Sequence, residues 1–413
     1  MKNGDIMRKG RNTGFAAMRR ITTIAVVALW AMFGHAFLGS QPAHAQTYTV
    51  LHNFTGGNDG GDPQGALIQV KGNLLGTTAG GGVYGFGAVY LLSETGKEDV
   101  LYNFEYFNGA QPNWGALLQD STGGVYGVTL GGGYYAYKGV LYKLSKGRGE
   151  TIIHQFGGPG DGLFAYSGVV ADAEGNLYGS TQSGGTTGSG TVFKVDSAGN
   201  YSILYNFTGK ADGGSPSGGL VWGSDGELYG ATQGGGSGAC VGNNGYPCGT
   251  LFKIDTAGNL TTLYSFNGTD GAFPYDGALA FDAAGNIYGT TTQGGAFGAG
   301  TVFKVDTSGT ETVLYSFTGN ADGFFPEAGV VLDSKGNIYG ITTGGGNLTA
   351  CQGGCGVVFK LSKAGEETVL HTFIGTDGAY PELGGLLGTS KGVLYGVTPS
   401  GGSSGQGVVF SLK

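Results

Sequence analysis

The sequence predicts an all-β protein, specifically a seven-bladed β-propeller made of four-stranded antiparallel blades. Glycine contributes 90 of 413 residues, yet the chain is 40% hydrophobic and holds 23 Tyr and 23 Phe. So much glycine argues against long helices, and so many aromatic residues argue against disorder. Three short markers also recur seven times in constant order, and the two chain ends match complementary parts of one repeat. Repeats of this length built from short strands are typical of propellers.

Residues 1–45 are predicted to be a secretory signal peptide. The segment has a basic start, an uncharged apolar run over 21–38 and the small residues of Ala43-His44-Ala45. This order is typical of cleaved export signals, so we expect cleavage after Ala45 and a secreted or periplasmic protein. An uncleaved membrane anchor is the alternative, because the apolar run is just long enough to span a bilayer.

Residues 46–413 are predicted to form a single propeller domain with an acidic surface. Without the first 45 residues the chain carries 15 basic and 28 acidic side chains. This charge disfavours a nucleic-acid partner or an anionic membrane surface. No later apolar run is long enough to cross a membrane, so we expect a soluble protein, and we expect it to be a monomer.

The repeats are defined by three markers. The Leu-Tyr-Ser-Phe marker and its variants end at Phe54, Phe104, Phe156, Phe207, Phe266, Phe317 and Phe373. The intervals between these ends are 50, 52, 51, 59, 51 and 56 residues. Asn-Leu-Tyr-Gly-x-Thr and Gly-Thr-Val-Phe-Lys-Val recur between them. The regular order indicates one structural unit written seven times.

Each repeat is expected to supply four short strands, as residues 168–207 illustrate. The first strand covers 168–171 and ends at a turn, and the second covers 176–181. A glycine-rich loop leads to the third strand at 191–195, and a second tight turn leads to the fourth at 202–207. Aromatic and β-branched residues of the last two strands share faces, which stabilises antiparallel pairs.

The chain ends predict closure of the ring. Residues 47–54 match a fourth strand without its first three, and residues 407–412 match a third strand without its fourth. Pairing of the two ends completes one blade and leaves no open sheet edge.

The markers resemble those of the bacterial GloVer tandem repeat. The similar segments are Gly-Thr-Val-Phe-Lys-Val-Asp, Leu-Tyr-Ser-Phe-Thr-Gly, Asp-Gly-x-x-Pro and Gly-Asn-Ile-Tyr-Gly-Thr-Thr, and they cover essentially all of 47–412. The resemblance implies an exported protein and supplies no catalytic residues. Many such proteins carry a C-terminal anchoring segment, but here Lys413 directly follows the last strand, so we expect no surface anchor.

The four cysteines mark two lengthened loops between second and third strands. Cys240 and Cys248 lie in the fourth such loop, and Cys351 and Cys355 in the sixth. In an exported protein, two local disulfides that hold these loops are the expected arrangement. A metal site is the alternative, although no histidine lies near either pair in the sequence.

The Asp-Gly-x-x-Pro segment follows each fourth strand and is expected to meet the glycine-rich loops at one mouth of the ring. Its acidic residues are candidate Ca²⁺ ligands: Asp59, Asp161, Asp212, Asp270, Asp322 and Asp377. Repetition in nearly every copy favours the simpler interpretation that each aspartate caps its own turn. We therefore expect no cofactor, with Ca²⁺ as the alternative.

Aromatic residues that break the repeat pattern are the candidate ligand-binding residues. They fall in the same mouth loops of different repeats: Trp114, Tyr134, Tyr135, Tyr137, Phe164, Tyr166, Phe273, Tyr275, Phe325 and Tyr380. Exposed aromatic side chains can stack on sugar rings or pack against a protein, or they can pack against neighbouring loops.

The sequence therefore predicts a binding or scaffold module that recognises an extracellular carbohydrate or protein at the mouth. A hydrolase or lyase that acts on polysaccharide through loop carboxylates is the alternative, but no acidic pair stands out from the repeat pattern. The three histidines after the signal segment, His52, His154 and His371, each replace the Tyr of Leu-Tyr-Ser-Phe. We expect them to be packing residues, because a catalytic base needs a partner constellation.

Overall fold

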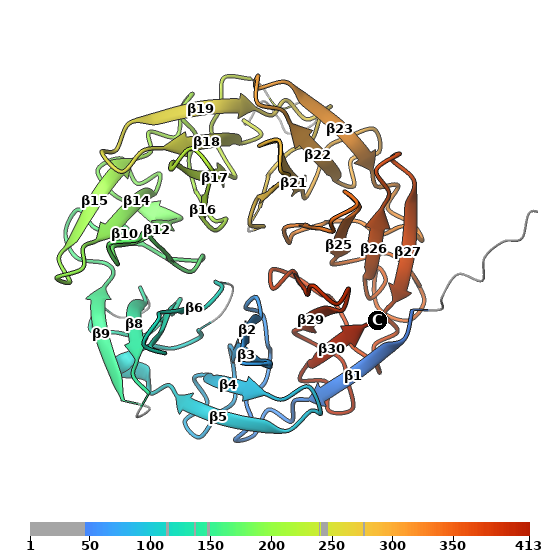
Figure 1. Ribbon diagram of the computed structural model, residues 1–413, viewed down its shortest axis with the longest axis horizontal. Helices are drawn as coiled ribbons and strands as arrows, with labels where there is room; N and C mark the ends of the chain where they lie inside the picture. The colour runs from blue at the N-terminus through green and yellow to red at the C-terminus, as the bar shows by residue number, and fades with distance from the viewer. Residues whose placement is uncertain are drawn as a thin grey trace, which may run out of the picture. The chain divides into compact units, whose positions relative to one another are not determined.

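Seven four-stranded sheets form a closed ring of blades in the computed structural model (Figure 1). The structure describes residues 46–413 except 113–114, 136–137, 147–148, 239, 241–246 and 276. Residues from Thr47 to Lys413 form one compact unit. The predicted fold class, a seven-bladed all-β propeller, is confirmed.

The first four blades follow one another along the chain. Blade 1 contains β2 (Ile68–Val70), β3 (Asn73–Thr78), β4 (Ala88–Leu92) and β5 (Glu98–Asn103). Blade 2 contains β6 (Leu118–Gln119), β7 (Val125–Val128), β8 (Val140–Leu144) and β9 (Glu150–Gln155). Blade 3 contains β11 (Val170–Ala171), β12 (Leu177–Thr181), β14 (Thr191–Val195) and β15 (Tyr201–Asn206). Blade 4 contains β16 (Val221–Trp222), β17 (Leu228–Thr232), β18 (Thr250–Ile254) and β19 (Leu260–Ser265).

The last three blades complete the ring. Blade 5 contains β20 (Ala280–Phe281), β21 (Ile287–Thr291), β22 (Thr301–Val305) and β23 (Glu311–Ser316). Blade 6 contains β24 (Val331–Leu332), β25 (Ile338–Thr342), β26 (Val357–Leu361) and β27 (Glu367–Thr372). Blade 7 contains β28 (Leu386–Gly388), β29 (Leu394–Thr398), β30 (Val408–Leu412) and β1 (Tyr48–Asn53).

Two small elements lie outside the blades. A two-stranded ladder joins β10 (Gly162–Leu163) to β13 (Ser183–Gly184), and a single 3-10 turn, η1, covers Tyr106–Asn108. No helix in the described part of the chain is long and apolar enough to cross a membrane.

The two ends of the chain close the ring as predicted. β1 pairs antiparallel with β30, from Tyr48 opposite Leu412 to Asn53 opposite Val408. Figure 1 shows the blue first strand outside the red last strands, so that blade 7 is shared between the two chain ends. Every blade therefore has its fourth strand at the outer rim. In blade 7 this strand is β1, which gives the blade its full set of four paired strands.

The innermost strands are shorter than the sequence indicates. The strand expected at 168–171 is reduced to Val170–Ala171. A Cβ on Gly168 would lie only 2.0 Å from the carbonyl oxygen of Ala116 in blade 2. Backbone contact between neighbouring blades, rather than a longer ladder, therefore fixes this segment beside the axis.

The core lies between blades and repeats an aromatic pair around the ring. The Phe that directly follows each fourth strand is fully buried and packs on the central aromatic ring of the third strand in the next blade. Ring centroids in these pairs are 5.0–5.5 Å apart, an edge-on or tilted geometry that aromatic rings favour. The Leu-Tyr-Ser-Phe marker is thus the contact that joins one blade to the next.

Glycine in the second strand makes room for this aromatic pair. A Cβ on Gly179 would lie 2.4 Å from Cζ of Phe193, and the matching glycines of the other blades lie equally close to their third-strand rings. The Tyr-Gly step of the second marker is therefore a packing requirement.

Candidate functional site

The loops that connect consecutive blades meet the glycine-rich loops on one face of the ring. Backbone bridges join the two loop types, as between Gly61 and Gly80 or between Gly214 and Gly234. We call this side the mouth face. The predicted grouping of the Asp-Gly-x-x-Pro and glycine-rich loops on one face is thereby confirmed.

Seven residues of the connecting loops, one before each blade, share a left-handed backbone conformation. Their φ angles lie between 53° and 59°, where residues other than glycine are uncommon. We call this set the mouth ring: Asp62, Gln111, Phe164, Ser215, Phe273, Phe325 and Tyr380. The backbone of the mouth ring is the same in all seven copies, but the side chain differs from copy to copy.

Hydrogen bonds to both neighbouring blades hold this conformation. The Asp62 N–H donates to the Gln406 carbonyl of blade 7 (2.9 Å), and its carbonyl accepts from the Ala79 N–H of blade 1 (2.9 Å). The Gln111 and Ser215 backbones make the same two bonds to their own neighbours. These bonds offset a strain of about 1–3 kcal/mol per left-handed residue. The mouth ring therefore presents variable side chains on a rigid frame.

Three of the predicted aromatic residues line one cavity on the mouth face, between blades 4, 5 and 6. The cavity has a volume of about 260 Å³. Its lining residues are Gln233, Phe273, Tyr275, Thr292, Gln293, Phe325 and Glu327. We call it the mouth cavity. Phe325 is 37% exposed and packs edge-on against Phe324, with ring centroids 4.8 Å apart.

The polar lining of the mouth cavity includes one group without a partner. The Nε2 atom of Gln233 is buried and has no hydrogen-bond partner among the described residues. Glu327 accepts a hydrogen bond from Thr343 Oγ1 at 3.0 Å, and burial raises the pKa of its carboxyl. The cavity thus combines aromatic faces with an amide donor and a carboxylate, as small-ligand sites commonly do.

Three carboxyl groups lie in consecutive connecting loops, and one of them, Glu327, lines the mouth cavity. We call Asp62, Glu327 and Glu382 the acidic arc. Burial raises the pKa of Glu382 to about 7, with further contributions from the charges of Glu327 and Asp62. Burial also raises the pKa of Asp62, although Gln64 Nε2 donates to its Oδ1 at 2.8 Å. The sequence analysis did not predict this group. The available signal was that Glu327 and Glu382 each directly follow the proline of their connecting loop.

The central channel of the ring is narrow and mostly apolar. A cavity of about 280 Å³ lies along it, lined by small residues such as Ala66, Ala116 and Val169. Tyr166 and Ser217 are among its few polar side chains. Of the predicted binding residues, Tyr166 therefore lies at the channel rather than in the mouth cavity.

Tyr134, Tyr135, Phe164 and Tyr380 do not line the mouth cavity. Tyr134 is 82% exposed and packs edge-on against Tyr135, with centroids 5.5 Å apart. Lys138 Nζ lies 4.5 Å from the ring centroid of Phe164, and the Tyr380 hydroxyl donates to the Gln352 carbonyl at 3.4 Å. Trp114 and Tyr137 lie outside the described residues.

Sequence reasoning also missed an exposed aromatic residue near Tyr134. Phe107 is 81% exposed and belongs to η1, where Tyr106 packs against both Phe86 and Phe107. The Gly133 N–H donates to the Tyr106 carbonyl at 3.1 Å, which joins this group to the Tyr134 loop. The signal was present, because the second repeat has Glu-Tyr-Phe before Asn108-Gly109, where the other repeats have a glycine-containing segment before Asp-Gly.

The six candidate calcium ligands are each held within their own turn. The Asp212 carboxylate accepts from the Thr208 N–H at 2.8 Å, and Asp322 accepts from the Thr318 N–H at 2.7 Å. Each also accepts a hydrogen bond from a fourth-strand tyrosine, Tyr205 or Tyr315. The same turn-capping pattern holds Asp59, Asp161, Asp270 and Asp377. Calcium binding by these residues stays a prediction.

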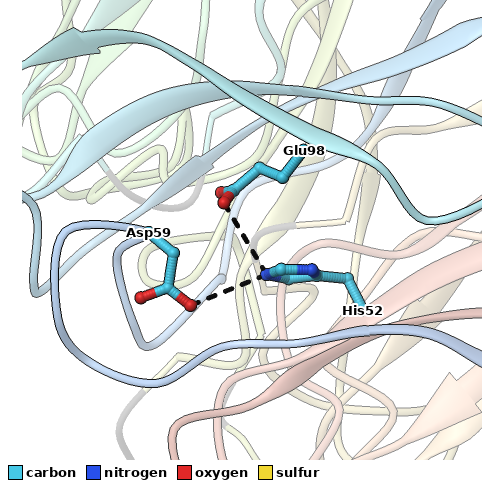
Figure 2. A group of neighbouring side chains, drawn as sticks. All are labelled: His52, Asp59 and Glu98. Atoms are coloured by element: carbon cyan, nitrogen blue, oxygen red, sulfur yellow. Dashed lines mark ion pairs between the residues drawn. The ribbon is translucent and has the colours of Figure 1, made fainter.

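Two of the three histidines pack against a neighbouring blade. His154 stacks on Tyr201 with centroids 3.6 Å apart, and its Nε2 lies 2.8 Å from Asp161 Oδ2. His371 makes the same arrangement with Tyr48 at 3.7 Å. His52 differs, since its Nε2 lies between the carboxylates of Asp59 and Glu98 (Figure 2).

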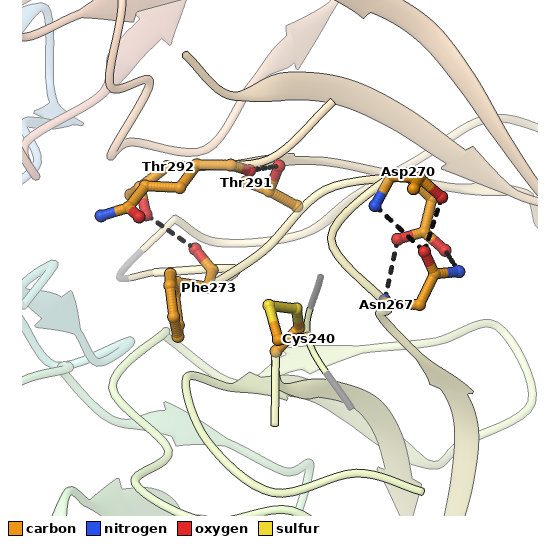
Figure 3. The surroundings of a disulfide bond; sticks show 9 residues. Cys240, Asn267, Asp270, Phe273, Thr291 and Thr292 are labelled. Atoms are coloured by element: carbon orange, nitrogen blue, oxygen red, sulfur yellow. Dashed lines mark hydrogen bonds between the residues drawn. A yellow bond between two sulfur atoms is a disulfide. The ribbon is translucent and has the colours of Figure 1, made fainter. Parts of the chain in front are cut away.

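The four cysteines form the two expected local disulfides. Cys240 pairs with Cys248 and Cys351 with Cys355, and no free cysteine occurs in the described part of the chain. Figure 3 shows the Cys240 disulfide close to Phe273, which packs against the same buried cluster. The disulfides therefore support mouth-ring residues, and they fit an oxidising compartment such as the periplasm or the extracellular space.

Several solved structures resemble the ring at low sequence identity. A gluconolactonase from Xanthomonas campestris matches with 11% identity and a TM-score of 0.44, and the alignment covers 89% of each chain. A luciferin-regenerating enzyme matches with 13% identity and a TM-score of 0.43, covering 72% of this chain and 90% of the other. The tricorn protease matches with 13% identity and a TM-score of 0.44, covering 76% of this chain and 26% of the other.

Comparison with curated proteins gives no match. The model of the Gloeobacter/Verrucomicrobia repeat matches this chain twice, over residues 113–242 and 238–413. The two matches cover most of the ring and agree with the repeat markers of the sequence. The chain belongs to the Gloeobacter/Verrucomicrobia repeat family.

Proposed function

We propose that this protein is an exported binding module whose mouth cavity binds a unit of an extracellular polysaccharide. The observation that carries the proposal is the mouth cavity itself, where Phe273, Tyr275 and Phe325 lie around unpartnered Gln233 Nε2. Sugar rings offer apolar C–H faces that pack on aromatic side chains, and hydroxyls that pair with amides and carboxylates. Its volume of about 260 Å³ suits a small unit such as one sugar residue.

Asymmetry within the ring supports this location. Functional sites are grafted onto a repeated scaffold by residues that depart from the repeat. The seven members of the mouth ring share one backbone conformation but differ in side chain, and only some of them are aromatic. Glu327 of the acidic arc lines the cavity and adds acceptors for sugar hydroxyls.

A glycan-binding screen followed by calorimetry on the best ligand tests the proposal. Phe325→Ala and Tyr275→Ala should each weaken binding by about tenfold, since a stacking contact is worth roughly 1.4 kcal/mol. Tyr134→Ala is the matched control, because Tyr134 is exposed and lies outside the cavity. Absence of any glycan ligand, or an equal loss in the control, would contradict polysaccharide binding at this site and leave a protein partner as the interpretation.

A polysaccharide hydrolase or lyase is the second candidate function, and the acidic arc is the observation that favours it. A carboxyl group with a pKa of about 7, such as that of Glu382, is suited to act as a general acid near neutral pH. Neighbouring Glu327 supplies a second carboxylate. The decisive assay is release of reducing ends from the bound glycan. Turnover that Glu382→Gln abolishes at an unchanged melting temperature would establish the enzyme, and binding without turnover would exclude it for that glycan.

We infer that residues 1–45 direct export and are removed after Ala45. The two disulfides support a compartment outside the cytoplasm, and the basic, apolar and A-x-A segments supply the signal. N-terminal sequencing of the protein recovered outside the cytoplasm should begin at Gln46. A protein that retains the first 45 residues would favour the membrane anchor.

A further inference from the structure

A cluster of metal-ligand side chains lies at the junction between the closing blade and blade 1. His52 belongs to β1, Asp59 to the loop that follows it, and Glu98 to β5 (Figure 2). His52 Nε2 lies 3.7 Å from Asp59 Oδ2 and 3.9 Å from Glu98 Oε2. One ligand atom from each residue lies within 4.8 Å of the other two, and no other such group occurs in the described part of the chain.

The other blade junctions show that this spacing is unusual. At the junctions of His154 and His371, the histidine Nε2 lies within 2.8 and 3.0 Å of its aspartate. A tyrosine ring, Tyr201 or Tyr48, covers each of those histidines. At the His52 junction the aspartate is further away, and a glutamate replaces the tyrosine.

Tyrosine occupies the histidine position at the four remaining junctions. There the residue of the next blade is Glu150, Leu260, Glu311 or Glu367. Histidine and glutamate therefore meet only at the junction between blades 7 and 1. His52 Nε2 is buried without a hydrogen-bond partner among the described residues, unlike Nε2 of His154 and of His371. Glu98 Oε1 also has no partner there, as is true of the matching glutamates of other junctions.

We propose that His52, Asp59 and Glu98 bind a divalent transition-metal ion, with Zn²⁺ as the preferred ion. Zinc binds imidazole nitrogen at about 2.0–2.1 Å and carboxylate oxygen at about 2.0–2.2 Å, which places tetrahedral ligands roughly 3.4 Å apart. The distances of 3.7 and 3.9 Å from His52 Nε2 to the two carboxylates are close to this value. A histidine ligand makes Ca²⁺ and Mg²⁺ poor candidates, because these ions prefer oxygen ligands.

The three side chains are mostly enclosed by the protein. Their side-chain exposures are 17% for His52, 18% for Asp59 and 12% for Glu98. Thr55 fixes the Asp59 carboxylate through its backbone N–H at 2.8 Å, as an outer partner of a metal ligand commonly does. With three protein ligands, the ion keeps at least one position for water.

Metal binding at this place would tie the N-terminal strand to the first complete blade. Its ligands come from β1, from the β1–β2 connection and from β5, so the ion joins blade 7 to blade 1. Ligands that bind only the folded state stabilise it. The ion would therefore hold β1, the strand that closes blade 7, against blade 1, independently of the mouth cavity.

Calorimetric titration of untagged, chelator-treated protein with Zn²⁺ tests the proposal, with Ca²⁺ titrated in parallel. His52→Tyr is the key variant, because tyrosine opposite glutamate already occurs at the folded junction of Tyr264 and Glu311. We expect one Zn²⁺ site per chain. His52→Tyr should lower its affinity for Zn²⁺ by at least about 100-fold, because loss of a direct ligand should cost at least as much as loss of a residue that only supports a ligand.

His154→Tyr is the matched control and should leave Zn²⁺ affinity unchanged, because that histidine faces a tyrosine rather than a glutamate. Zn²⁺ should also raise the melting temperature of the wild-type protein and of the His154→Tyr variant, but not of His52→Tyr. No Zn²⁺ binding by the wild-type protein, or equal binding by wild type and His52→Tyr, would overturn the proposal. Stronger binding of Ca²⁺ than of Zn²⁺ would overturn the choice of ion.

Discussion

At the scale of single residues, the mouth ring separates backbone geometry from side-chain identity. Members such as Phe273 and Phe325 take a left-handed conformation that a following proline and two backbone hydrogen bonds constrain. The residue type can then vary without loss of the loop path, because the backbone bonds do not involve the side chain. This arrangement lets a nearly seven-fold structure carry an asymmetric site.

The glycine that precedes each third strand gives a residue-scale prediction. Gly300 has φ of 101°, and a Cβ there would lie 2.5 Å from the Thr291 carbonyl oxygen and 2.6 Å from Cδ of Pro326. Gly300→Ala should therefore lower the free energy of unfolding by about 2–4 kcal/mol, since backbone strain and overpacking add. Chemical denaturation measures the change.

Gly298 supplies the control for that substitution. Its φ of 75° is also positive, but a Cβ there would meet nothing within 4 Å. Gly298→Ala should cost only about 1 kcal/mol, the conformational part alone. If the two variants lose the same free energy of unfolding, close packing against Pro326 is not the reason why residue 300 is a glycine.

At the scale of elements, the fourth strands place half-buried glutamates against the aspartates of the preceding connecting loops. Burial raises the pKa of Glu311 to about 7, and the charge of Asp270 adds to the effect. Burial raises the pKa of Glu367 to about 7 in the same way, with Asp322 as the neighbouring charge. Ionisation of these glutamates therefore opposes folding.

These two glutamates predict a loss of stability between about pH 4.5 and pH 7. A carboxyl whose folded pKa exceeds its ordinary value contributes stability that is complete below the ordinary value and is lost as pH rises through the folded value. Glutamine mimics the protonated acid, so Glu311→Gln and Glu367→Gln together should raise the melting temperature at pH 8 by about 2–4 °C, after allowance for partial exposure. At pH 5 the gain should be small.

The neighbouring, exposed Glu366 is a control for this pH dependence, and Glu366→Gln should not change it. Thermal melts of the variants at pH 5 and pH 8 provide the comparison. A gain of the same size at both pH values would mean that packing, rather than ionisation, causes the effect.

Elements were predictable from the sequence wherever repetition exposed them. The seven Leu-Tyr-Ser-Phe copies located the fourth strands, the spacing of cysteines located the disulfide loops, and the half-repeats at 47–54 and 407–412 located the closing blade. The short inner strands were overestimated, because their ends are set by backbone contact with other blades, as at Gly168. Such contacts leave no periodic signal in the strand itself.

At the scale of the whole molecule, the candidate sites depend on which repeats become neighbours. Asp62 and Glu382 lie near opposite ends of the chain, yet their charges interact, because ring closure brings the first connecting loop beside the last. His52 and Glu98 meet because they belong to the fourth strands of neighbouring blades, which come from consecutive repeats. Sequence reasoning treated each residue against its own repeat, so it found exposed aromatics such as Phe325 but missed both acidic groups.

We propose that the mouth face binds its ligand through its asymmetric cavity. Amide hydrogen exchange with and without the glycan identified in the screen tests this location. We expect slower exchange in the loops at 271–275 and 323–328, which line the mouth cavity, and unchanged exchange in the opposite-face turns at 172–175 and 333–336. Protection confined to the opposite-face turns, or spread equally over all seven blades, would contradict it.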